Sequence, residues 1–304
     1  MTQIALVTGA SSGFGRMIAS DLAAAGITSY ASMRHTKGRN AQAVSEIAAE
    51  AKEKGTDFRT IELDVQDQGS IDTAIEKIIA EHGRLDILVH NAGHMVWGPL
   101  EAFTPEQLAE LYDVNVLGSQ RVNRAVLPHM RKARSGLLIW VSSSSTMGGI
   151  PPMLGPYFAA KAGMDQIAVS YARELAPFGI ETSIMVPGAY TKGTNHFAHA
   201  GSPADTLRAS EYTAGWPKDF SDRMLKALAA TDPEDSDPTE IGRAVARIAT
   251  MKPGTRPFRT VIDPADDGSA ISSPVVDRIR NEFLHRIGFP ELAHIGEQPA
   301  GMWK

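Results

Sequence analysis

The chain has 304 residues, and 43% of them are hydrophobic, enough for a sizeable core in one large α/β domain or two small ones. Its 30 basic and 35 acidic residues are interspersed and give a net charge of -5, so we expect neither nucleic acid nor a membrane surface as a partner. The absence of cysteine excludes disulfides, thiolate nucleophiles and cysteine-ligated zinc. Because an apolar segment follows Met1 almost directly and no apolar run is long enough to cross a bilayer, we expect a soluble cytoplasmic protein.

Short apolar, β-branched segments alternate with longer segments of helical periodicity along about the first 190 residues. The helical segments include one from about Gly15 to Ala25 and one long helix, "PEQLAELYDVNVLGSQRVNRAVLPHMRKA". The predicted strands, in chain order, are "IALVTG", "TSYASM", "FRTIELDV", "LDILVHNAG", "SGLLIWVSS" and "IETSIMVPG". Strands that are apolar on nearly every residue are typical of a parallel sheet covered on both faces. The pattern therefore predicts a doubly wound α/β fold in a single domain, residues 1–304.

Residues 190–237 interrupt this alternation. They are rich in Gly, Pro and His and then helical through "DFSDRMLKALAA". An irregular insertion of this length is typical of a functional lid, so we expect one here. A helix, "PTEIGRAVARIATM", and a short strand near "FRTVID" follow. The C-terminal extension, 263–304, contains one more predicted helix, "SSPVVDRIRNEFLHRIG".

The first predicted strand ends in a glycine-rich turn, "TGASSGFG", and a helix begins directly after it. Glycine permits the tight turn, and the free N–H groups and positive dipole of the helix N-terminus then face any bound anion. In this context the turn predicts a pyrophosphate site. The alternative is a structural turn that binds nothing. The residues expected to contact the cofactor here are Gly9, Ser11, Ser12, Gly13, Phe14 and Gly15.

The end of the second strand discriminates between the two nicotinamide dinucleotides. Where an acidic side chain would bind the ribose hydroxyls of NAD, the sequence has Met33 and then Arg34, with Lys37 and Arg39 nearby and no acid among them. Such a basic segment suits the 2′-phosphate of NADP, because a guanidinium pairs with phosphate. We therefore expect NADP(H) as the cofactor. The alternative is a solvated basic loop.

The stretch "PYFAAK" separates Tyr157 and Lys161 by four residues, which puts them on one face of a predicted helix. A cation beside a phenol stabilises the phenolate, so that a tyrosine can act as an acid or base near neutral pH. The pair alone is also compatible with a half-buried tyrosine beside a solvated lysine.

Five motifs together resemble the short single-domain branch of the short-chain dehydrogenase/reductase (SDR) superfamily: "TGASSGFG", "NAG", "DVNVLG", "VSSSS" and "YFAAK" occur in the order and spacing of that family. The resemblance implies a Rossmann-type fold and hydride transfer between a nicotinamide cofactor and a carbonyl or alcohol. It implies that Tyr157 is the general acid or base. Lys161 would bind the nicotinamide ribose and lower the phenol pKa, and Asn115 would hold a water of a proton relay.

The resemblance also implies a serine that orients the substrate oxygen, about thirteen residues before the tyrosine. That count gives Ser144, with Ser143 as the alternative. Further cofactor contacts are implied at the adenine (Asp64 and Val65), at the adenosine side (Asn91, Ala92 and Gly93) and at the nicotinamide (Pro187, Gly188 and Thr191, with Thr194 as the alternative to Thr191).

We expect no metal site, because His90 with His94 and His196 with His199 lack both a shared helix and a third ligand. The favoured function is an NADP(H)-dependent carbonyl reductase or alcohol dehydrogenase. If the aromatic side chains after the fourth strand and in the lid line the cleft, its substrate is hydrophobic: Met95, Trp97, Tyr190, Phe197, Tyr212 and Trp216.

Two alternatives remain. An NADP(H)-binding redox sensor without turnover would be expected to lack Tyr157 or Lys161, and an SDR-type epimerase or dehydratase would need a larger substrate domain. In related proteins the two helices equivalent to those around Asn115 and Tyr157 pack against a second subunit, which implies a homodimer or homotetramer.

Overall fold

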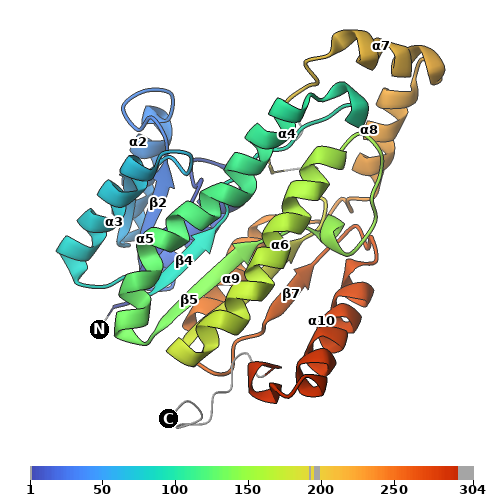
Figure 1. Cartoon of the computed structure of the whole chain (residues 1–304). Helices are drawn as coiled ribbons and strands as arrows, with labels where there is room; N and C mark the ends of the chain where they lie inside the picture. The colour runs from blue at the N-terminus through green and yellow to red at the C-terminus, as the bar shows by residue number, and fades with distance from the viewer. Residues whose placement is uncertain (1, 192, 195–198, 294–304) are drawn as a thin grey trace.

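The computed structural model describes residues 2–191, 193–194 and 199–293. Seven parallel strands form one sheet in the order β3-β2-β1-β4-β5-β6-β7 (Figure 1). The predicted doubly wound α/β fold is thereby confirmed. The strand order reverses between β1 and β4, and the carboxyl ends of strands at such a point open a crevice for a ligand. The strands are β1 (Ile4–Val7), β2 (Thr28–Met33), β3 (Phe58–Glu62), β4 (Ile87–His90), β5 (Gly136–Val141), β6 (Ile180–Pro187) and β7 (Arg259–Ile262).

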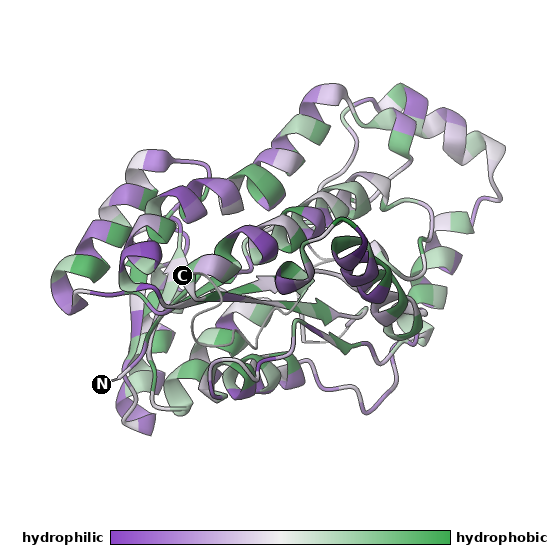
Figure 2. Ribbon diagram, turned by 60° about the horizontal axis from the view of Figure 1, so that its bottom comes forward, coloured by the Kyte–Doolittle hydropathy of each residue, from purple (hydrophilic) through white to green (hydrophobic). Residues whose placement is uncertain are grey.

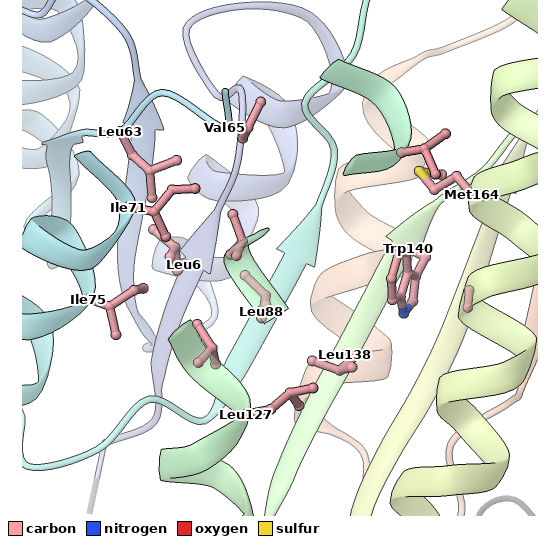
Figure 3. Close-up of a cluster of buried hydrophobic side chains, with 14 of the residues drawn as sticks. Leu6, Leu63, Val65, Ile71, Ile75, Leu88, Leu127, Leu138, Trp140 and Met164 are labelled. Atoms are coloured by element: carbon pink, nitrogen blue, oxygen red, sulfur yellow. The ribbon is translucent and has the colours of Figure 1, made fainter. Parts of the chain in front are cut away.

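Helices cover both faces of this sheet, as the continuous apolar strands predicted (Figure 2). One face packs against α1 (Gly13–Ala24), α2 (Ala41–Lys54) and α9 (Thr239–Thr250). The other packs against α3 (Gln68–His82), α5 (Gly118–Ala133) and α6 (Gly155–Leu175). Alternate residues of each strand point to opposite faces, so β1 sends Leu6 into one core and Val7 into the other. Figure 3 shows the core that contains Leu6, on the face covered by α3, α5 and α6. The side chains of Leu88 and Trp140 lie there between the sheet and α5 and α6.

The predicted long helix from 105 to 133 is broken into three parts. The first, α4 (Pro105–Tyr112), starts with a capping box in which Thr104 and Gln107 bond each other's backbone N–H. The helix is then wider over a π-helical segment, η2 (Asp113–Leu117), before α5 begins. Such π-helical insertions are frequent at functional sites. Here the insertion holds Asn115, one of the predicted site residues.

The segment 190–237 contains two helices, α7 (Thr206–Gly215) and α8 (Phe220–Ala230), of which the sequence predicted only the second. They project beyond the carboxyl end of the sheet, next to α4 (Figure 1). The C-terminal helix α10 (Ser269–Arg286) lies beside β7, at the edge of the sheet. Short helical turns occur at Leu100–Ala102, Ser144–Thr146, Ala176–Phe178 and Pro290–Ala293. Within the described ranges, no helix combines the length and apolar character that a bilayer span requires.

Candidate active site

A cavity of about 550 Å³ opens at the carboxyl ends of β4, β5 and β6, at the predicted crevice. It brings together side chains from segments that are far apart in the sequence: Phe14 and Asn91 at one end, Ser143, Tyr157 and Lys161 in the centre, and Pro187 and Gly188 opposite them. Most of its remaining wall is apolar, formed by Met95, Ile150, Pro151, Leu154, Phe158, Tyr190 and Leu228. The structure thus gathers three of the four predicted catalytic residues and the nicotinamide-side residues around one mostly apolar hollow, and Asn115 does not line it.

Tyr157 and Lys161 occupy one face of α6, as predicted, but the lysine ammonium does not touch the phenol. Its Nζ lies 6.0 Å from the centre of the tyrosine ring and donates a hydrogen bond to the Val141 carbonyl at 2.8 Å. The Lys161 side chain is buried, with 5% of the residue exposed. Burial lowers the pKa of Lys161 to about 8, against the opposing charge of Asp165.

Burial raises the pKa of Tyr157 to about 12, and a hydrogen bond with the Ser143 side chain offsets only part of this effect. Lys161 is not among the causes of this shift. Its ammonium is bonded to the Val141 carbonyl, and the lowering of the phenol pKa that the resemblance implies stays a prediction for the site with its cofactor bound. At neutral pH the phenol keeps its proton, and in that form it can serve as a general acid.

Ser143, and not Ser144, meets the Tyr157 phenol. Strand β5 ends at Val141, and a helical turn begins at Ser144. Ser143, directly before this turn, is extended and presents its hydroxyl to the cavity. Ser144 is buried and bonds the Asp267 carboxylate instead. The structure therefore favours Ser143, the alternative, over Ser144 as the serine beside the tyrosine, because the end of β5 determines which side chain faces α6.

Asn115 is held by two backbone carbonyls. Its Nδ2 donates to Leu111 at 2.9 Å and to His94 at 3.2 Å. Its Oδ1 is buried and has no hydrogen-bond partner among the described residues. A buried acceptor without a donor is costly. The free Oδ1 therefore fits the expectation that Asn115 accepts a hydrogen bond from a water.

The glycine-rich turn is locked onto the end of β4. The Thr8 hydroxyl accepts hydrogen bonds from the backbone N–H groups of Asn91 and Ala92, both at 3.0 Å. The Asn91 side chain in turn donates to the carbonyls of Thr8 and Gly9, at 2.9 and 3.0 Å. A β-carbon at Gly15 would lie 2.3 Å from the Asn91 amide nitrogen, so only glycine fits there. Gly9 and Gly13 have φ of 65° and 57°, which glycine adopts without strain.

The remaining residues of this turn, Ser11, Ser12 and Phe14, lie where the chain enters α1. Ser12 precedes the first helical residue, and its side chain makes no capping bond to the helix N-terminus. The first N–H groups of α1 thus lack a side-chain cap from this residue and suit an anion. Phe14 packs edge-on against Tyr190, with 5.6 Å between the ring centres.

Arg34 follows β2 directly, and its side chain is 40% exposed. The loop after β2 contains no acidic residue, as predicted. However, Asp64, which follows β3, brings a carboxylate to 3.8 Å from the Arg34 guanidinium. An exposed pair at this distance is weak, so the guanidinium remains able to bind a phosphate. Asp64 is oriented by the backbone N–H of Gln66, which donates to its carboxylate at 3.0 Å, and Val65 is buried behind it.

At the nicotinamide end, Pro187 is the last residue of β6. Gly188 follows it and packs against Asp263. A β-carbon on Gly188 would lie 2.0 Å from a carboxylate oxygen of Asp263, so a larger residue does not fit there. Thr191 is held by Asp232, which accepts from both its N–H and its hydroxyl, at 2.7 and 2.8 Å. Nothing in the sequence indicates this role for Asp232, because the residue lies forty-one positions after Thr191 and belongs to no motif. The alternative residue, Thr194, donates to the Tyr190 carbonyl at 3.0 Å.

The aromatic residues expected around the cleft divide into two groups. Met95 and Tyr190 line the cavity. Tyr212 and Trp216 pack with each other and Trp216 with Phe220, at ring-centre distances of 5.4 and 4.4 Å, and they join α7 to α8. The Trp97 indole donates to Ser221 of α8 at 3.3 Å. Phe197 and His196 lie outside the described residues.

The structure describes three of the four histidines considered for a metal, all but His196. His90 is buried, stacks on Trp140 and shares a hydrogen bond with the Asn123 side chain at 2.8 Å. His94 lies next to the "NAG" segment, and its backbone carbonyl accepts from Asn115. In the part of the chain that the structure describes, no group of three His, Asp or Glu side chains is arranged to hold a metal ion.

Known proteins resemble this chain over most of its length. The sequence profile of the short chain dehydrogenase family matches residues 3–202. The chain is 33% identical over 265 residues to the 3-ketodihydrosphingosine reductase of Bacteroides thetaiotaomicron, covering 86% of this chain and 88% of that protein. It is 38% identical over 187 residues to the 3-oxoacyl-[acyl-carrier-protein] reductase FabG of Escherichia coli, covering 61% and 72%.

Among solved structures, a short-chain dehydrogenase from Streptomyces avermitilis superposes with a TM-score of 0.70 at 29% identity, covering 94% of this chain and 97% of that one. The profile match spans well over half of the chain and includes the glycine-rich turn, Asn115, Tyr157 and Lys161. The chain therefore belongs to the short-chain dehydrogenase family and is an oxidoreductase of the SDR type.

Proposed function

We propose that this enzyme reduces a ketone on a largely apolar substrate with NADPH, or oxidises the corresponding alcohol with NADP⁺. The observation that carries the proposal is the contact of a protonated Tyr157 phenol with Ser143 inside a mostly apolar cavity. The nicotinamide group supplies or accepts the hydride when bound. The chain itself supplies the proton, the orientation of the substrate and a site with little water.

The residues divide this work as follows. Tyr157 Oη gives its proton to the carbonyl oxygen in reduction and takes it back in oxidation. Ser143 Oγ donates a hydrogen bond to the same oxygen and so fixes its position between two hydroxyls. Lys161 presents a charged ammonium near the ribose and the phenol, and Asn115 Oδ1 holds the water through which the proton on Tyr157 is replenished.

The remaining contacts would hold the dinucleotide. The glycine-rich turn at the N-terminus of α1 suits the pyrophosphate, and Asp64 with Val65 suits the adenine. Gly93, Pro187 and Gly188 leave room for the cofactor beside the catalytic residues, and Thr191 suits the carboxamide. We assign NADP(H) rather than NAD(H) because Arg34 is accessible and only weakly paired.

The substrate proposal rests on the cavity wall and on the relatives. Leu154, Phe158 and Leu228 belong to an apolar lining that favours a hydrocarbon chain or ring system. Both relatives carry names that specify a 3-keto or 3-oxo substrate. We therefore propose a ketone near one end of an apolar chain. The segment 190–237 would act as a lid, since Tyr190, Leu228 and Thr231 all contribute to the cavity.

We further propose that two copies associate through α5 and α6. A groove between these helices is lined by Leu127, Tyr171 and Phe178, and Phe178 is partly exposed. Light scattering coupled to size exclusion distinguishes a homodimer or homotetramer from a monomer, and Phe178→Glu is expected to shift the larger species toward the monomer.

The deciding experiment follows the loss of reduced-nicotinamide absorbance over a panel of ketones, quinones, aldehydes and steroids, with NADPH and with NADH. Turnover with NADPH that disappears in Tyr157→Phe supports the reductase. Tight NADPH binding without turnover of any carbonyl would favour the redox sensor. Conversion of a substrate without net consumption of NADPH would favour an epimerase or dehydratase.

A further inference from the structure

A buried ionic network lies directly behind the catalytic residues. Arg259 of β7 donates two hydrogen bonds to Asp165 of α6, at 2.7 and 3.1 Å. The same guanidinium donates to Asp277 of α10 at 2.7 Å. The side chains of Arg259 and Asp165 are only 5% and 3% exposed. Asp165 also accepts a hydrogen bond from the Ser142 hydroxyl at 2.7 Å.

One end of this network adjoins catalytic groups. Asp165 follows Lys161 by one helical turn on α6 and therefore shares its face. Its partner Ser142 stands between Val141, whose carbonyl binds the Lys161 ammonium, and Ser143, a hydrogen-bond partner of the Tyr157 phenol. The network thus ties the middle of α6, one turn after Lys161, to the end of β5 beside Ser143.

General stabilisation does not explain an arrangement of this kind. Removing two charges from water costs about as much as their attraction returns, and apolar replacements of buried ion pairs are often neutral. What a bidentate guanidinium–carboxylate pair does supply is a fixed geometry, because both planar groups must align. The geometry fixed here is the position of α6 relative to β7 and, through the Ser142 hydrogen bond to Asp165, to the end of β5.

We propose that Arg259 and Asp165 are positioning residues of the proposed reductase, which hold Lys161 and Ser143 in register by clamping α6 to the end of β5. The proposal rests on the proposed function for its kinetic consequence. It assigns a role to β7 and α10, which lie beyond the residues 3–202 that the family profile matches. Through Asp277, the C-terminal helix becomes part of the catalytic framework.

The charges around Lys161 give the clamp an electrostatic signature. The Asp165 carboxylate on the same helix raises the pKa of Lys161 against the effect of burial. The other titratable group near the ammonium is the Tyr157 phenol, and β5 contributes only a carbonyl. Arg259 donates from Nη1 and Nη2 to both oxygens of the same carboxylate.

The test uses Arg259→Met, Asp165→Asn and the conservative Arg259→Lys. Arg256→Met is the matched control, since Arg256 is also a buried arginine, 7% exposed and paired with Glu181, but touches no catalytic element. We expect Arg259→Met to lower kcat by about 10- to 100-fold, the usual effect of removing an orienting partner, with the KM for NADPH little changed. Arg259→Lys should recover part of kcat. The control should lose thermal stability to a similar extent and keep its kcat.

A second measurement does not need turnover. Acetylation of Lys161, followed by mass spectrometry as a function of pH, reports its pKa. Asp165→Asn is expected to move that titration, and the alkaline limb of kcat, to lower pH, because the carboxylate charge is lost. Equal kcat in Arg259→Met and Arg256→Met, or an unmoved titration in Asp165→Asn, would overturn the clamp. A wild-type enzyme that turns over no carbonyl would instead overturn the proposed function, and the titration would still decide the clamp.

Discussion

Ser143 Oγ lies 2.8 Å from Ser145 Oγ and is a hydrogen-bond partner of the Tyr157 phenol, whereas the neighbouring Ser144 hydroxyl is a partner of the Asp267 carboxylate. Only Ser143 is placed to share a substrate oxygen with the tyrosine. We therefore expect Ser143→Ala to lower kcat by about 100-fold or more, as the loss of one donor to a developing charge typically does. Steady-state kinetics on the best ketone of the panel would measure it.

Ser144→Ala serves as the comparison within the same turn. It is expected to change kcat less than about tenfold, because it removes a bond to Asp267 and none to the reacting atoms. A larger loss of kcat in Ser144→Ala than in Ser143→Ala would restore the assignment that the residue count first suggested.

Cofactor choice gives a second prediction. Arg34 is an accessible cation directly after β2, so Arg34→Met is expected to raise the KM for NADPH about 10- to 100-fold, the value of one charge-assisted bond to phosphate. The KM for NADH should stay within about twofold, since NADH has no 2′-phosphate for the guanidinium to bind. Equal increases in the KM values for NADPH and NADH would show that Arg34 maintains the shape of the loop and does not bind the 2′-phosphate.

The sequence was sufficient for the parts of the site that local chemistry determines. The glycine-rich turn, the Tyr157 and Lys161 pair and the buried strands each depend on residues close in the chain, and all lie where they were predicted. The contacts that depend on tertiary packing were not accessible in this way. In the sequence, Asp165 cannot be distinguished from any other acidic residue of a helix. Its role depends on Arg259 of β7, which lies ninety-four positions later in the chain. The choice between Ser143 and Ser144 likewise required the end of β5.

The π-helical segment shows the same limit. Its sequence, "DVNVL", continues the helical periodicity on both sides, so nothing local indicated the extra residue. The widening becomes understandable only in the fold, where the Asn115 amide must reach the carbonyls of both Leu111 and His94. A sequence pattern specifies the helix, but the tertiary bonds select where it is interrupted.

Gly93 provides a third prediction, because a β-carbon there would lie 2.2 Å from Asn115 Oδ1. Gly93→Ala must displace the amide that is expected to hold the relay water. We expect kcat to fall by about tenfold or more, and NADPH binding, measured by fluorescence, to weaken less than kcat falls, although Gly93 also borders the proposed cofactor site. Gly26→Ala is a suitable control at a glycine with open space around it, although its φ of 83° should reduce stability alone. Loss of NADPH binding in Gly93→Ala without loss of kcat at saturation would contradict this role.

The buried His90 gives a prediction about acid stability. Burial lowers its pKa to about 4 from the usual 6.5, against a hydrogen bond that its Nε2 donates to Asn123 Oδ1. The unfolded chain therefore binds a proton at His90 between these two values and the folded chain does not, so the free energy of unfolding must fall as the pH falls from 6.5 to 4. At pH 4 the loss attributable to this one group is about 3 kcal/mol.

Urea denaturation of wild type and His90→Gln at pH 7 and at pH 4 measures this loss. The variant gives up the stacking on Trp140 and is expected to be less stable at pH 7. Its further loss between pH 7 and pH 4 should nevertheless be smaller than that of the wild type by about 3 kcal/mol, since glutamine does not titrate. His129→Gln, at an exposed histidine, is the control that leaves the buried polar contacts intact. If wild type and His90→Gln lose the same stability on acidification, His90 accepts its proton without leaving the core, and the acid lability of the fold arises from its carboxylates.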